Sequence, residues 1–221
     1  MKSLFQLITV FLISVFDSNL NAQKLEFGLQ SGLNLSNTHI FNKDDFTDHD
    51  RIYYPLVLVN GNAYLGYKSE SFWGFSFEPG FIQKGGLRKD VWISTGNEIY
   101  QPQDVKYISN YIQLPILTDI FFTERFFISF GPEFSIFLNS KAKGEFLTFN
   151  SSAENDKFEV SGILSVNYSP FKFMDLGLRY NHGITSPSYL IWVDDFGNYV
   201  GRSKQFNQYF QFTLRFKKNW R

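Results

Sequence analysis

The sequence contains no cysteine, few histidines and no excess of either charge. Without cysteine the chain cannot form a disulfide framework, a Cys-ligated metal centre, a thiol nucleophile or an N-terminal lipid anchor on cysteine. The three histidines, His39, His49 and His182, have unrelated spacings, which argues against a histidine-rich metal site. Lys+Arg and Asp+Glu both number 21, whereas a nucleic-acid-binding protein needs a basic excess. We therefore expect no cofactor, no metal and no nucleic-acid partner.

A long apolar run is also missing. After residue 22 no stretch reaches 18 consecutive apolar residues, so we expect no transmembrane helix in the mature protein. Residues 1–22 begin with Met-Lys, continue with the apolar run Leu4 to Phe16 and end in Ala22, a pattern typical of a secretory signal peptide. The run is too short to span a bilayer, which needs about 20 residues. We expect cleavage after Ala22, leaving residues 23–221 as the exported domain.

Aromatic residues are abundant: there are 27 Phe, 12 Tyr and 4 Trp, yet the mean hydropathy is only -0.20. From Lys24 onward large apolar residues recur at every second position, and small or polar residues stand between them. This alternation indicates strands with two different faces. It predicts eight strands, at about 24–36, 56–68, 72–84, 106–118, 125–139, 157–169, 173–185 and 205–217.

The connections between these strands alternate in length along the whole chain. Short connections are predicted at 69–71, 119–124 and 170–172, and long ones at 37–55, 85–105, 140–156 and 186–204. Transmembrane barrels have short periplasmic turns and longer external loops. The sequence therefore predicts four long external loops, with both ends of the chain on the periplasmic side.

The orientation of the apolar face separates a membrane barrel from a soluble one. A soluble β-barrel or sandwich, the alternative, would turn its apolar face inward. The interior of an eight-stranded barrel is only just wide enough for side chains to fill, so it cannot hold large aromatics from every strand. We therefore expect the apolar face to meet lipid. The predicted fold is all-β: an eight-stranded antiparallel, up-and-down transmembrane β-barrel in the cell outer membrane, preceded by a cleaved signal peptide.

Three segments resemble the PorT-like outer-membrane β-barrel family of Bacteroidetes (outer membrane protein beta-barrel domain). They are Glu26 to Ser36 in the first strand, Tyr111 to Ile116 in the fourth and Gly131 to Glu133 in the fifth. The resemblance covers essentially the whole mature chain. It implies an eight-stranded barrel in a Gram-negative envelope. The namesake's link to secretion and gliding machinery is not transferred. In one departure, the chain continues past Phe216 to Arg221 instead of ending on an aromatic residue.

Several charged residues fall on the face that we expect to line the interior. A buried charge is costly unless it is paired and hydrogen-bonded. The strand directions bring the periplasmic ends of the first, seventh and eighth strands together, which suggests an interior ionic cluster of Glu26, Asp175, Arg179 and Arg215 that plugs the lower barrel. A charged conduction path is the alternative. The other inward carboxylates are Glu78, Glu133 and Glu159.

Two further features have competing interpretations. Glu78 and Glu133 could serve as an acid–base pair, but a whole strand separates them and the sequence shows no substrate groove. The acidic segment 42–50 could hold a cation, but it lacks the spacing and glycine of a calcium loop, so a solvated loop is favoured. Three prolines within predicted strands, Pro79, Pro115 and Pro132, predict local β-bulges, because proline removes a ladder donor.

These observations favour a non-enzymatic, monomeric protein with an envelope structural or surface-interaction role. Its external loops would act on a rigid scaffold, where loops often carry function. The expected partners are outer-membrane lipid and other envelope proteins, contacted through the loops or the periplasmic turns. Alternatives are a narrow solute channel, a membrane enzyme acting on lipid and an accessory subunit of a secretion machinery.

Overall fold

The computed structural model describes residues 24–41, 53–91, 94–95, 98–99, 102–145, 148–151, 157–193 and 199–220. They form β1 (Lys24–Phe41), β2 (Leu56–Lys68), β3 (Trp73–Phe77), β4 (Gly80–Val91), β5 (Ser94–Thr95), β6 (Glu98–Ile99), β7 (Gln103–Phe121), β8 (Phe126–Lys143), β9 (Thr148–Ser151), β10 (Phe158–Phe171), β11 (Met174–Gly183), β12 (Ser188–Val193) and β13 (Tyr199–Trp220). Within these ranges no helix has the length and apolar character needed to cross a membrane. The predicted signal peptide and the acidic segment 42–50 lie outside the described residues.

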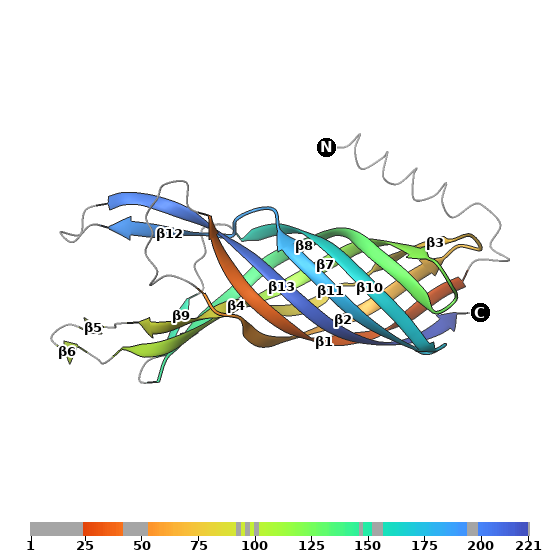
Figure 1. Ribbon diagram of the computed structural model, residues 1–221, viewed down its shortest axis with the longest axis horizontal. Coiled ribbons are helices and arrows are strands. Elements are labelled where there is room, and N and C mark those ends of the chain that lie inside the picture. The colour runs from red at the N-terminus through yellow and green to blue at the C-terminus, as the bar shows by residue number, and fades with distance from the viewer. Residues whose placement is uncertain are drawn as a thin grey trace.

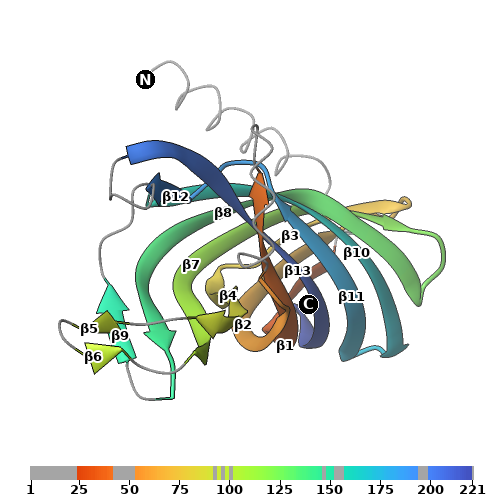
Figure 2. The same cartoon turned by 60° about the vertical axis from the view of Figure 1, so that its left-hand side comes forward.

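The strands form a closed antiparallel ring, as Figures 1 and 2 show. In order around the ring it contains β1, β2, β3 with β4, β7, β8, β10, β11 and β13. Arg215 of β13 pairs with Gln30 of β1 on one side and with Asp175 of β11 on the other, and this double pairing closes the barrel. The predicted all-β, up-and-down fold with eight barrel strands is confirmed.

The two ends of the barrel differ. The connections from β2 to β3, β7 to β8 and β10 to β11 are tight and share one end with the start of β1 and the finish of β13 (Figure 1). We call this the turn end. The opposite end, the loop end, carries β5 paired with β6, β9 paired with β8, and β12 paired with β13. The predicted alternation of short and long connections is thus the alternation between these ends.

Strand lengths follow the prediction closely in some places and exceed it in others. β2 has the predicted bounds, whereas β1, β7, β8 and β13 all run farther at the loop end. Their extra residues continue the pairing of neighbouring strands, as in Lys106 of β7 with Lys143 of β8. Apolar alternation stops where the belt ends, so it gives no signal for these extensions.

The predicted bulges at the three prolines are wrong. Pairing of β8 with β10 runs through Pro132 without a shift, and β7 keeps one register with β8 on both sides of Pro115. At Pro79 the strand is interrupted between β3 and β4, but both pieces keep the same register against β7.

The reason lies in the proline carbonyl groups, which still accept. The Ala63 amide donates to the Pro79 oxygen at 2.9 Å, and the Glu78 amide donates to the Pro115 oxygen at 3.1 Å. A proline removes a donor but leaves the carbonyl in place, so the chain can continue without an inserted residue. Register shifts occur elsewhere, including one between Asn110 and Tyr111.

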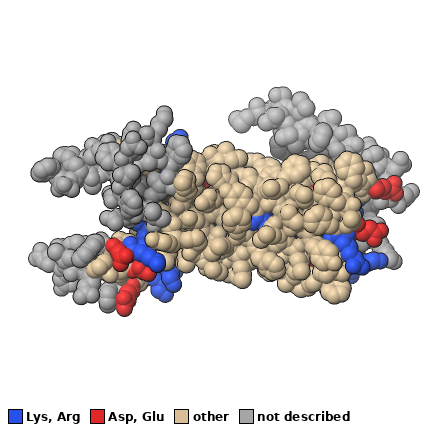
Figure 3. Space-filling model, viewed as in Figure 1, with Lys and Arg blue, Asp and Glu red and all other residues tan. Residues whose placement is uncertain are grey.

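The distribution of polarity is inverted relative to a soluble protein. On β1, Leu29 and Leu33 are 70% and 56% exposed, whereas their neighbours Gln30 and Asn34 are 2% and 0% exposed. The same alternation runs around the ring, and Figure 3 shows a middle belt almost free of charged side chains, with charges gathered at both ends. A belt of exposed apolar side chains on a closed barrel is suited to lipid.

The interior is not filled by small polar residues alone. It also contains five buried aromatic side chains: Tyr64, Tyr111, Phe127, Phe137 and Tyr209. Tyr111 and Phe137 face each other edge to face, with ring centroids 5.6 Å apart. The expectation of a small and polar interior was therefore incomplete, because the lumen also holds a few large rings.

The close approach of β7 and β8 at Gly131 gives a testable stability prediction. A Cβ on Gly131 would lie 2.1 Å from the Ile116 backbone oxygen, whereas a Cβ on Gly61 would meet nothing within 4 Å. We expect Gly131→Ala to lower the free energy of unfolding by about 1–3 kcal/mol through overpacking. Urea unfolding in detergent micelles measures this, with Gly61→Ala as the control that leaves stability unchanged. Equal stability of the two variants would contradict the close approach.

Candidate functional site

The interior of the barrel holds most of the buried charges of the described residues, in two networks. The Glu78 network consists of Glu26, Glu78, Asp175, Arg179, Arg215 and Lys217. The Glu133 network consists of Lys84, Glu133 and Glu159. Each brings together strands that are not neighbours in the ring, so each crosses the lumen.

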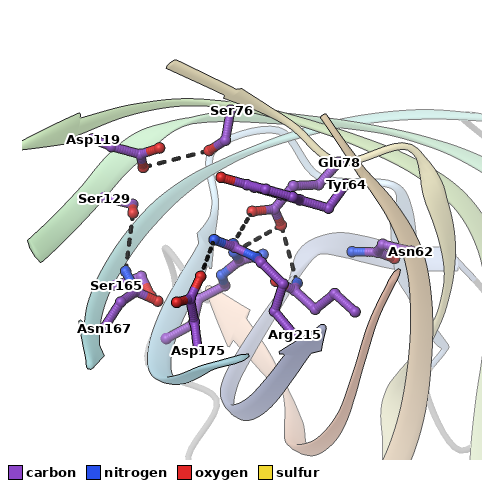
Figure 4. A network of polar contacts seen from close by, with 12 residues as sticks. Asn62, Tyr64, Ser76, Glu78, Asp119, Ser129, Ser165, Asn167, Asp175 and Arg215 are labelled. Carbon is purple, nitrogen blue, oxygen red and sulfur yellow. Dashed lines mark hydrogen bonds and ion pairs between the residues drawn. The ribbon is translucent and has the colours of Figure 1, made fainter. Parts of the chain in front are cut away.

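Glu78 is the centre of the first network and is 0% exposed. One carboxylate oxygen, Oε2, accepts from Arg179 Nη2 at 2.8 Å and from Gln30 Nε2 at 3.0 Å. The other, Oε1, accepts from Arg215 Nη2 at 2.6 Å. Figure 4 shows Arg215 between the carboxylates of Glu78 and Asp175. Glu78 lies at the junction of β3 and β4, and Arg179 lies on β11, which is diametrically opposite in the ring.

From Arg215 the network continues toward the turn end. Arg215 Nη1 donates to Asp175 Oδ2 at 3.4 Å, and Lys217 Nζ bridges Asp175 at 3.1 Å and Glu26 at 3.0 Å. The Arg215 guanidinium also stacks over the Tyr64 ring, 3.9 Å from its centroid. A buried ion pair needs such additional contacts to offset the loss of hydration.

The structure brings the four residues of the hypothesised cluster together in a different way from the one expected. Arg215 contacts Asp175 directly. Glu26 is connected to the cluster through Lys217 and through the Tyr64 hydroxyl, which donates to Glu26 Oε2 at 3.5 Å, and Arg179 is connected through Glu78. Glu78 and Lys217 were not assigned to this cluster. Lys217 shares the inward alternation of Arg215 and could have been included. Glu78 could not, because contacts across a lumen leave no signal in the order of strands.

The Glu133 network lies closer to the loop end. Lys84 Nζ is 2.9 Å from Glu133 Oε1 and 3.3 Å from Glu159 Oε1, and all three side chains are 0% exposed. The Tyr209 hydroxyl donates to Glu133 Oε2 at 2.7 Å, and Asn207 Nδ2 donates to Glu159 Oε2 at 3.0 Å. Glu133 and Glu159, which the sequence placed on the inward face without partners, thus share one lysine.

The two networks meet on either side of one proline. Pro115 of β7 pairs with Glu133 of β8, and its carbonyl accepts from the Glu78 amide on the other side. Because each carboxylate is fully buried and bound to cations, this arrangement does not provide an accessible acid–base pair. Within the described part of the chain no group of three His, Cys, Asp or Glu side chains could hold a metal ion. What the arrangement can do is fill and rigidify the lumen.

One buried carboxylate differs from these. Asp119 of β7 is 2% exposed and accepts from the Ser76 hydroxyl at 3.4 Å. Among the described residues no Lys or Arg lies within ion-pair distance of it. It offers an internal comparison for the carboxylates that carry ion pairs.

A closed ring of this kind, with an apolar belt and a charged, packed lumen, defines the class of membrane β-barrels. The family described as outer membrane protein beta-barrel domain matches residues 21–188. The match covers more than half of the chain, and the chain belongs to this family of outer-membrane barrels. No curated protein sequence is significantly similar to it.

Solved structures of bacterial outer-membrane barrels share the fold. Neisserial surface protein A (NspA) is 10% identical, with 86% of this chain and 96% of NspA covered and a TM-score of 0.50. Ail, the attachment invasion locus protein of Yersinia pestis, is 11% identical, with coverages of 87% and 98% and a TM-score of 0.42. OprG from Pseudomonas aeruginosa is 10% identical, with coverages of 89% and 95% and a TM-score of 0.39. At these identities the similarity to NspA shows a shared fold and nothing about function.

The networks predict unequal effects for two matched carboxylate-to-amide substitutions. Glu78→Gln leaves Arg179 without its anion, so we expect the free energy of unfolding to fall by about 3–5 kcal/mol. Asp119→Asn removes a buried carboxylate that has no ion pair and retains an acceptor for Ser76, so its effect should stay below about 1.5 kcal/mol. Urea unfolding in the same detergent compares the two. Equal losses would show that Glu78 is not the centre of the network.

Proposed function

We propose that the chain is a closed, non-enzymatic outer-membrane barrel with an envelope structural or surface-interaction role exerted at its loop end. The observation that carries this proposal is the pair of ionic networks that cross the lumen. Glu78 is bound to an arginine from the diametrically opposite strand, and Lys84 of β4 is bound to carboxylates of β8 and β10. The interior of an eight-stranded barrel is only just wide enough for its own side chains.

These contacts argue against the narrow solute channel. An open pore needs a continuous aqueous path, along which charged side chains would be exposed. Glu78, Lys84, Glu133 and Glu159 are instead all 0% exposed, and Arg179 is 1% exposed. The same burial argues against a catalytic use of the two central carboxylates, which no substrate could reach.

The loop end is the more suitable surface for an interaction. Strands β7, β8 and β13 extend past the apolar belt, and β9 and β12 add further pairing there. The connections at the turn end contain only a few residues each, so they offer a smaller surface. Function on barrels and sandwiches commonly resides in loops held by the rigid strands.

Three further parts of the proposal follow from the closed, apolar-belted ring. The barrel is monomeric, because its first and last strands pair with each other and leave no open edge in the part of the wall that crosses the apolar belt. Outer-membrane lipid is its immediate partner, around the exposed apolar belt. Export through a signal peptide cleaved after Ala22 is the route by which such a protein reaches the outer membrane.

A second candidate is an accessory subunit of a secretion machinery, in line with the finer resemblance to PorT-like barrels of Bacteroidetes. Two motif residues behind that resemblance, Tyr111 and Pro115, are both buried inside the barrel. Tyr111 packs against Phe137, and Pro115 lies between the two networks. These positions support a shared interior architecture and specify no partner, so the surface-interaction role remains the preferred proposal.

The lumen predicts the result of a conductance measurement. Protein extracted from outer membranes should migrate faster on a gel unboiled than boiled, as a folded barrel does. The same preparation should produce no stable conductance steps in a planar bilayer, because the ionic networks block the lumen. An open porin inserted into the same bilayer serves as the positive control. Stable conductance from the folded protein would overturn the proposal, and the inward charges would then be selectivity determinants of a pore.

A further inference from the structure

A register shift near the loop end changes which side chains of β8 face outward. On the turn-end side of the shift, odd-numbered residues of β8 point inward, as the buried Phe137 shows. The pairing of β7 with β8 shifts between Asn110 and Tyr111, which inserts one residue on β8, and Leu138 and Asn139 are consecutively exposed. Because side chains alternate with a period of two, one extra residue reverses the faces of all that follow. Odd-numbered residues beyond the shift therefore point outward.

This reversal places three lysines on the outer wall. Lys106 of β7 and Lys143 of β8 are directly paired, and Lys141 lies two residues from Lys143 on the same face. All three are exposed. Like charges directly opposite each other destabilise a sheet. In the described part of the chain no carboxylate lies within ion-pair distance of these lysines.

The order of side chains along this wall matches the layers of a membrane. Exposed Ile112, Ile136 and Leu138 belong to the apolar belt. Next comes a row of amides, in which Gln83 donates to Asn110 at 3.1 Å and Asn110 donates to Asn139 at 2.6 Å. The lysines follow, and exposed Asp104 and Glu145 lie farthest from the belt. Toward the loop end in Figure 3, basic and acidic side chains lie side by side just beyond the belt.

The spacing agrees with a headgroup layer. Lys141 is three residues beyond Leu138, which is about 10 Å along a strand and about 7 Å along the membrane normal at a tilt of about 45°. The polar layer on each side of a bilayer is about 5–8 Å thick. Lys143 and its partner Lys106 lie two residues farther out, about 5 Å more along the normal at the same tilt. Lysine side chains extend from such positions back to the interface. Three lysines near a membrane surface attract anionic lipid.

We propose that Lys106, Lys141 and Lys143 form a binding site for the phosphate groups of an anionic lipid in the outer leaflet. The occupant is a phosphorylated headgroup because the site combines three exposed lysines, which form no ion pair with a described carboxylate, with a position at headgroup depth. The carboxylates of Asp104 and Glu145 lie beyond the lysines and repel anions on the external side. The site thus favours phosphate that approaches from the membrane. This proposal goes beyond the surface-interaction role and does not depend on whether the lumen conducts.

The test measures binding of lipid A, which carries two phosphates, to the full barrel in zwitterionic detergent, beside lipid A with its phosphates removed. Substituting all three residues, as Lys106→Gln, Lys141→Gln and Lys143→Gln, should weaken binding on the order of 100-fold. A matched control removes three exposed turn-end charges, by Arg125→Gln, Lys172→Gln and Lys218→Gln. The control should bind as the unmodified protein does, and the dephosphorylated lipid should bind weakly to every variant.

A second variant keeps the proposal testable if the triple substitution impairs folding. Asp104→Asn with Glu145→Gln removes the repelling carboxylates and should tighten lipid A binding several-fold. Unchanged affinity of the folded triple variant would overturn the site. An equal loss in the turn-end control would do the same, because binding would then follow net charge alone. Equal binding of dephosphorylated lipid would show that the phosphate groups are not recognised.

Discussion

The closed ladder of backbone hydrogen bonds is the constraint on which the rest of this structure depends. In hydrocarbon an unpaired backbone N–H or C=O costs several kcal/mol, so a sheet can cross a membrane only if it has no edge. Pairing of β13 with both β1 and β11 meets that condition. Once the ring is closed, successive side chains along each strand face the lipid and the lumen in turn. The apolar residues face the lipid, and the mostly polar residues between them face the lumen.

Some charges in this lumen find partners on a neighbouring strand, as Arg215 does with Asp175, and others find them across the lumen. Glu78 obtains Arg179 from the opposite wall, and Lys84 obtains two carboxylates from strands two and three positions away. Removing one member of a buried pair leaves an uncompensated charge, which costs more than the intact pair contributes. The interior networks therefore fix the relative positions of distant strands, beyond what the ladder itself imposes.

Much of the fold could be predicted from the sequence, and less of the site. Alternation identifies the inward face, so Gln30, Glu78, Glu133, Arg179 and Arg215 were all assignable to the lumen. Partner choice was not, since alternation says nothing about depth or direction across the ring. The prolines were misread for a related reason. A missing donor suggests an inserted residue, but the carbonyls of Pro79 and Pro115 still accept hydrogen bonds from neighbouring strands, and the register does not change.

Pro115 lies where the backbone ladder and the two ionic networks come together. It lies in the ladder between Glu78 and Glu133, the centres of the two networks. Pro115 is itself buried on the inward face. Proline is compact and contributes no polar side-chain group that would itself need a partner. Its missing donor weakens the ladder of β7, and the Lys84–Glu133 ion pair connects β4 and β8, the two strands that flank β7. The two networks are thus adjacent in the lumen without sharing a charged residue.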